Sequence, residues 1–172
     1  MTNTEWTARR ILGSLADPEL RKTILTSFWK QADQTMRAVT TAQLARAMRF
    51  REETIRKATA EKKAEWLGSR VQSAELEEAF EAALMVFHTT KQKEMLTAFL
   101  DRWSVPHNEG SIEENEYKVP AAAQVTEAVE ALKDQFPVRE IAVYLASAGL
   151  LMGGEWREAT WPVVETYASE LQ

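Results

Sequence analysis

The chain has 172 residues, which is enough for one full hydrophobic core and lies at the upper end of ordinary single-domain size. Its apolar fraction of 45% and charged fraction of 27% are typical of a folded globular protein and argue against a disordered one. The absence of cysteine excludes disulfides, thiolate catalysis and cysteine-ligated zinc or iron–sulfur clusters. Only 6 Gly and 5 Pro interrupt a composition rich in helix formers, so we expect a single all-α domain over residues 1–172.

The net charge of −5 hides an asymmetry along the chain. Residues 1–70 form a basic half with 14 Lys and Arg against 8 Asp and Glu, whereas residues 71–172 form an acidic half with 7 against 18. A basic half is suited to an anionic partner, and the alternative is that the two halves face each other within the fold or across an oligomer interface. With no signal-like N-terminus and no run of ~20 apolar residues, we expect a soluble cytoplasmic protein that does not bind a membrane.

The first part of the chain is predicted to be helical with few breaks. A short helix over about 5–15 precedes a restart, where Asp17 is a good N-cap and Pro18 fits the first helical position. Apolar residues at three- and four-residue spacing then predict an amphipathic helix of about 20 residues that reaches Met36. A threonine pair is expected to cap the next stretch, 40–68, which is either one interrupted helix or two to three short ones.

The second part alternates helices with one long gap. Ser73 is expected to cap a helix that ends near Phe87, and a further helix covers 90–103, with a threonine cap at residue 89 or 90. Residues 104–118 are polar and acidic and form a loop that is longer than most. Within 104–119, a turn of four residues between Ile112 and Tyr117 would make a small hairpin.

Three helices are expected after this loop. The first begins at Pro120 and is broken by Pro137. The stretch that follows, up to a Gly153-Gly154 stop, is the most apolar of the chain, so we expect it at the centre of the core. The last helix is expected to begin at Trp161-Pro162. These segments together predict about seven to nine helices in an irregular or orthogonal bundle, with helical-repeat packing as the second choice.

Both histidines lie beside the predicted helix 90–103. If His88 and His107 each lie just beyond an end of this helix, they are separated by ~20 Å, because the helix rises ~1.5 Å per residue. They would bind one metal ion only if the loop doubled back along the helix. His88 follows a phenylalanine at a helix end, and for this residue we favour a structural role over a catalytic one.

The loop after this helix holds the candidate binding residues. Oxygen ligands around His107 are suited to a hard cation, and the four residues that we select are Asp101, His107, Glu109 and Glu113. The calcium-loop template fails here, because it would need an Asp at the position of Val105. The alternative is an ordinary solvated acidic loop. No resident metal or other cofactor is predicted.

Residues 43–57 resemble a helix-turn-helix motif. In this interpretation Arg51, Thr54, Arg56 and Lys57 point outward from the second helix and would contact nucleic acid. The stretch departs from the motif at the turn glycine, here Arg49, and in carrying two glutamates at 52 and 53, which phosphates would repel. A basic solvated helix has the same pattern.

No nucleophile elbow and no phosphate-binding glycine loop is present in the sequence. The leading hypothesis is therefore a non-enzymatic helical module that binds a protein partner or itself. Nucleic-acid binding through residues 43–57 and a metal-dependent enzyme or metal-binding protein centred on His107 are the two alternatives. Of the 6 tryptophans, Trp156 lies between a glycine and an arginine, and we expect it to contact a partner.

Overall fold

The computed structural model describes residues 5–113 and 117–172. Over these residues the chain is all-α, with 11 α-helices, of which 9 have seven or more residues, one 3₁₀ turn and a two-stranded hairpin. The all-α class is thus confirmed, and the 9 helices of seven or more residues match the expected seven to nine. Contacts between residues divide the chain into two compact units, an N-terminal unit of residues 7–87 and a C-terminal unit of residues 88–172 that includes Glu5 and Trp6. The single domain over 1–172 stays a prediction.

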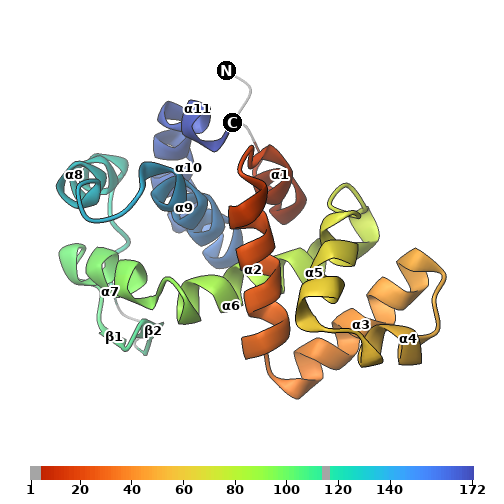
Figure 1. Ribbon diagram of the computed structural model, residues 1–172. Helices are drawn as coiled ribbons and strands as arrows, with labels where there is room; N and C mark the ends of the chain where they lie inside the picture. The colour runs from red at the N-terminus through yellow and green to blue at the C-terminus, as the bar shows by residue number, and fades with distance from the viewer. Residues whose placement is uncertain (1–4, 114–116) are drawn as a thin grey trace. The chain divides into compact units, whose positions relative to one another are not determined.

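The N-terminal unit is built from short helices. They are α1 (Ala8–Ser14), α2 (Pro18–Gln31), α3 (Gln34–Met48), α4 (Glu52–Lys57), α5 (Ala60–Gly68), the 3₁₀ turn η1 (Ala74–Leu76) and α6 (Glu77–Thr90), in which the boundary between the units follows residue 87. Helix α2 packs along α5 (Figure 1), and α3 packs against α4 and η1. The largest fully buried side chains of this unit come from all of its helices and include Phe28 of α2 and Phe80 of α6.

The boundary between α2 and α3 differs from the prediction. The helix that was expected to reach Met36 ends at Gln31, and Asp33 begins the next one by accepting a hydrogen bond from the backbone N–H of Met36. An Asp at the N-cap satisfies an amide that would otherwise lack a partner, so it outweighs the continuing apolar spacing. The threonine pair expected to cap the next segment lies inside α3, where Thr40 is buried. The stretch after it does divide into short helices and ends at Gly68.

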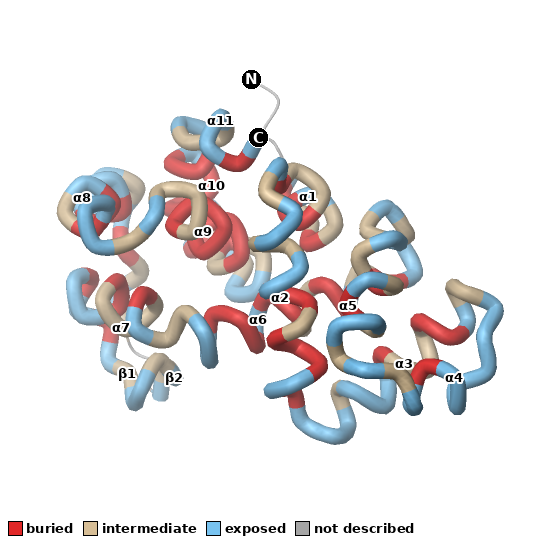
Figure 2. The backbone as a smooth tube through the Cα atoms, in the orientation of Figure 1, coloured by how far each residue is buried: buried red, intermediate tan, exposed pale blue. Residues whose placement is uncertain are grey.

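The C-terminal unit contains α7 (Lys93–Arg102), α8 (Ala122–Leu132), α9 (Val138–Met152), α10 (Gly154–Thr166) and α11 (Ala168–Leu171). Helix α9 packs against α10 and α11, and α10 also packs against α8. Eight of the 15 residues of α9 are buried, which agrees with its expected central place in the core (Figure 2). None of the helices in the described part of the chain is long and apolar enough to span a bilayer.

Helix α10 begins earlier than predicted. The chain turns at Gly153, whose φ is 65°, and α10 starts at Gly154 and continues through Pro162. The tertiary structure overrides the proline signal here, because Trp161 lies against α9 and donates its indole N–H to the carbonyl of Ala146 at 3.2 Å. Such an anchor outweighs the one backbone hydrogen bond that a proline removes.

The segment between α6 and α8 also differs from the expectation. Helix α6 continues to Thr90, so the threonines at 89 and 90 end one helix rather than cap the next. A hairpin lies within 104–119, but it pairs His107–Asn108 with Ser111–Ile112 in antiparallel register. The turn expected between Ile112 and Tyr117 falls largely on residues 114–116, which lie outside the described residues.

Candidate functional site

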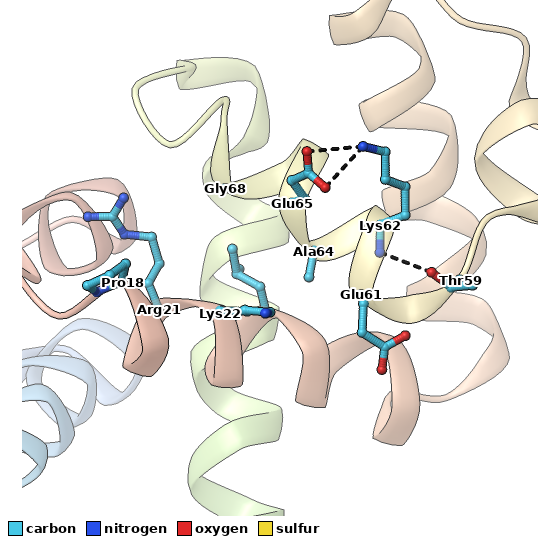
Figure 3. A pocket seen from close by; sticks show the side chains of 10 residues that line it. Pro18, Arg21, Lys22, Thr59, Glu61, Lys62, Ala64, Glu65 and Gly68 are labelled. Atoms are coloured by element: carbon cyan, nitrogen blue, oxygen red, sulfur yellow. Dashed lines mark hydrogen bonds and ion pairs between the residues drawn. The ribbon is translucent and has the colours of Figure 1, made fainter.

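A cleft of about 560 Å³ lies between α2 and α5 of the N-terminal unit (Figure 3). Helix α2 enters it at its first turn, where Asp17 accepts hydrogen bonds from two backbone amides and Pro18 takes the first helical position. Helix α5 enters at Thr59, whose hydroxyl caps the helix by accepting from the N–H of Lys62. Both helices that form the walls are therefore capped at their N-termini. The residues that line the cleft are Pro18, Arg21, Lys22, Leu25, Thr59, Glu61, Lys62, Ala64, Glu65 and Gly68.

The floor of the cleft is apolar and tightly packed. Leu25 of α2 and Ala64 of α5 are both almost fully buried. At Gly68 a Cβ atom would lie 3.3 Å from a methyl carbon of Leu25, so the absence of a side chain lets α5 approach α2 closely. The cleft is consequently preformed by helix packing and does not depend on a loop.

The rim of the cleft carries charges of both signs. Glu61 forms an ion pair with Lys30 at 2.7 Å, which lowers the pKa of Glu61, and the charge of Lys22 lowers it further. Lys62 and Glu65 form a second pair at 3.0 Å along α5. Each carboxylate of the cleft therefore already has a lysine partner.

The residues selected in the acidic loop are only partly brought together. The Nε2 atom of His107 lies 3.0 Å from a carboxylate oxygen of Asp101, and its Nδ1 atom accepts the N–H of Gly110 at 3.0 Å. Glu109 forms an ion pair with Lys93 of α7 at 2.7 Å, and Glu113 is exposed. The ion pair lowers the pKa of Glu109.

These bonds give His107 a role within its own hairpin. Since Nδ1 accepts a hydrogen bond, Nε2 carries the proton and donates to Asp101. Both ring nitrogens are thus used to tie the turn at Gly110 to the end of α7. Within residues 5–113 and 117–172, no three or more His, Asp or Glu side chains gather closely enough to hold a metal ion.

The helix-turn-helix-like stretch forms two helices, α3 and α4, joined by a tight turn. Arg49 adopts the left-handed conformation with φ 56°, which the motif's glycine would adopt more easily. The four selected residues are all exposed. They are Arg51, which directly precedes α4, and Thr54, Arg56 and Lys57 within it. However, α4 has only 6 residues, and Glu53 forms ion pairs with both Arg56 and Lys57. Two of the three positive charges are therefore partly neutralised within the helix.

His88 and Trp156 belong to the core of the C-terminal unit. His88 is 4% exposed, and its Nε2 lies 3.1 Å from the hydroxyl of Ser147. Trp156, expected to contact a partner, is 5% exposed and donates to the hydroxyl of Tyr117 at 3.1 Å. It packs edge-on against Trp103, so the side chain that was expected to contact a partner is buried within its own unit. A neighbouring glycine and arginine do not reveal what a side chain packs on.

Sequence reasoning missed the α2–α5 cleft. Its two walls are about 40 residues apart in the chain, and the predicted long helix gave no reason to place Lys22 near Glu61. Two signals were present, namely the Asp17-Pro18 helix start and the glycine at 68, but neither names a partner helix. Only the packing of α2 on α5 brings these residues together.

Comparison of the chain with models of known families, with curated proteins and with solved structures found no match. The function of the chain therefore has to be inferred from its own geometry and charge.

Proposed function

We propose that the protein is a non-enzymatic helical interaction module that binds a segment of a protein partner in the α2–α5 cleft. The observation that supports this proposal is the cleft itself, a preformed hollow of about 560 Å³ with an apolar floor. Its volume falls in the range of pockets that bind ligands, about 300–1,000 Å³. The partner is another protein or a second copy of this chain.

The arrangement of residues in the cleft resembles the anatomy of a protein interface. Apolar groups that include the buried Leu25 and Ala64 line the cleft together with charged groups. Interfaces between proteins likewise combine apolar groups with a polar rim. Rim charges of both signs orient a partner and speed its association, and like charges placed opposite each other there lower the affinity.

Two smaller hollows offer less to a partner. One, of about 290 Å³, lies along α1, and its Arg9 is already bound to Glu77 and to the carbonyl of Gln72. The other, of about 360 Å³, lies between the start of α8 and α10, with two glutamates on its wall. We therefore place the partner on the α2–α5 cleft.

The alternative of nucleic-acid binding through residues 43–57 receives weaker support. Phosphate contacts need free cations, and Glu53 holds two of the three basic side chains in question. The alternative of a metal-dependent protein at His107 is also less well supported, since the histidine already uses both nitrogens in the hairpin. Both remain predictions that DNA-binding and metal-titration measurements can check.

Selection from a phage library of random short peptides tests the proposed function, because such a selection needs no identified partner. We expect peptides that bind the wild-type chain and lose at least about tenfold in affinity on the double change Lys22→Glu and Lys62→Glu, because both positions stand on the cleft. Affinity is measured by fluorescence anisotropy of the selected peptides.

The matched control is the double change Lys91→Glu and Lys118→Glu, which alters the net charge equally at exposed positions of the C-terminal unit. It should leave peptide affinity within about twofold of wild type. If the selected peptides bind both double variants as tightly as wild type, the cleft is not the binding site and the proposal fails.

A further inference from the structure

The positive charges of the α2–α5 cleft are not fully balanced. Both of its carboxylates already pair with lysines, Glu61 with Lys30 and Glu65 with Lys62. The cations that remain are Arg21 and Lys22, which stand next to each other on α2 (Figure 3). An anionic group is therefore what this end of the cleft lacks.

Arg21 is a fixed cation. Its Nε donates to the carbonyl of Leu12 at 2.9 Å, and its Nη2 donates to the carbonyl of Leu15 at 2.8 Å, at the end of α1. Neither acceptor is a carboxylate, so these bonds hold the guanidinium in place without cancelling its charge. A cation that is already oriented loses little freedom when a ligand binds.

Lys22 completes the pair. It is exposed, and among the described residues it makes no hydrogen bond or ion pair, although its charge acts on the pKa of Glu61. In Figure 3 its side chain lies between Arg21 and Glu61. A carboxylate that enters the cleft at this point would meet two positive charges from one helix.

The wall next to these cations is apolar. Pro18 precedes Arg21 by one helical turn, and Leu25 follows it by one turn, on the same side of α2. Gly68 and Ala64 of α5 complete this wall. We infer that the cleft recognises a carboxylate carried next to an aliphatic chain, as on an acidic protein segment with a neighbouring aliphatic residue. This inference rests on the proposed function and names the chemistry of its ligand.

The test uses the simple carboxylates formate, acetate, butyrate and hexanoate on the intact, ¹⁵N-labelled chain. We expect shifts of the backbone amide signals of Leu25, Ala64 and Gly68, which surround the apolar wall. Affinity should rise along the series by about fourfold for each methylene group that becomes buried. The change Lys22→Glu should lower the affinity for hexanoate by about fivefold, because it replaces an attraction with a repulsion.

Two controls separate the parts of this inference. Hexylammonium has the same number of carbon atoms and the opposite charge, and it should not shift the cleft signals. Lys91→Glu changes the net charge by the same amount away from the cleft and should leave the hexanoate affinity unchanged. Circular dichroism verifies that each variant is folded.

The outcomes also separate this inference from the proposed function. If hexanoate leaves the cleft signals unchanged, or if hexylammonium binds as well as hexanoate, the anionic ligand class is wrong. The proposed function would still stand if phage-selected peptides without acidic residues lost affinity on the Lys22→Glu and Lys62→Glu change. If neither carboxylates nor selected peptides depend on Lys22, both the function and the ligand class are overturned.

Discussion

At the scale of single residues, the two histidines show that the surroundings of a side chain decide its role. His107 is tied into its hairpin by two hydrogen bonds, whereas His88 is buried in the core of the C-terminal unit. The hydroxyl of Ser147 donates its proton to the carbonyl of Val143 at 2.7 Å. It can therefore only accept from His88, whose Nε2 must carry the proton in the neutral ring.

This arrangement predicts a dependence of stability on pH. Burial lowers the pKa of His88 from 6.5 to about 3, so the folded chain resists protonation of this ring while the unfolded chain does not. Its stabilising contribution is complete above about pH 6.5 and is lost as the pH falls toward 3. We expect the free energy of unfolding to fall by about 1.4 kcal/mol per pH unit in this window from His88 alone.

Urea unfolding of the wild type and of His88→Gln at several pH values between 7 and 4 measures this contribution. Gln keeps a donor toward Ser147 and does not titrate in this range, so the variant should show a flatter pH dependence. The carboxylates affect the stability of both proteins equally, so their contributions cancel in the difference between the two. Equal slopes for the two proteins would show that His88 is not the group responsible.

At the scale of elements, the most extensive packing in the C-terminal unit is that of α9 on α10. Gly149 of α9 faces Trp161 and Thr160 of α10, and a Cβ atom on Gly149 would lie within 3.0 Å of atoms of both side chains. Both neighbours are buried and have little room to move. The approach of the two helices therefore depends on the glycine.

A pair of Gly→Ala substitutions tests this dependence. Gly149→Ala should lower the free energy of unfolding by about 1–3 kcal/mol, since overpacking forces the indole ring of Trp161 to shift. Gly13→Ala in α1 meets only the flexible amide end of Gln72 at 3.1 Å, and should raise stability by up to about 1 kcal/mol because alanine favours the helix. Urea unfolding compares the two variants, and a loss at Gly13 as large as that at Gly149 would contradict this account of the packing.

At the scale of the whole molecule, charge is distributed unequally between the two units. Residues 7–87 carry 14 Lys and Arg against 11 Asp and Glu, and the remainder of the chain carries 7 against 15. The cleft with its two available cations belongs to the unit with the net positive charge. An acidic surface on a second copy of the chain is therefore one candidate partner for this cleft.

Light scattering checks this self-association version of the proposed function. We expect the mass to rise above 19.5 kDa with concentration at an ionic strength of about 0.02 M, and to fall back toward it at about 0.5 M, where charges are screened. Lys22→Glu should weaken the rise. A mass of 19.5 kDa at every concentration would remove self-association and leave a partner of different sequence.

The sequence alone predicted the all-α class, the number of helices of seven or more residues and the starts of α2 and α9. Caps and apolar spacing are local signals, so Asp17 and Pro18 were sufficient to begin α2, and the apolar run of α9 was sufficient to place it in the core. Local signals failed where two of them competed, as at the α2–α3 boundary, and where a tertiary contact decided, as at Pro162 in α10.

The tertiary structure alone decided where a binding site can lie. The loop around His107 concentrates donor residues in sequence, yet their hydrogen bonds are largely used within the loop and on α7. The α2–α5 cleft joins residues about 40 positions apart, and no local pattern records which helix packs on which. That packing depends on the fit of buried surfaces such as Leu25 against Gly68, which exists only once the chain is folded.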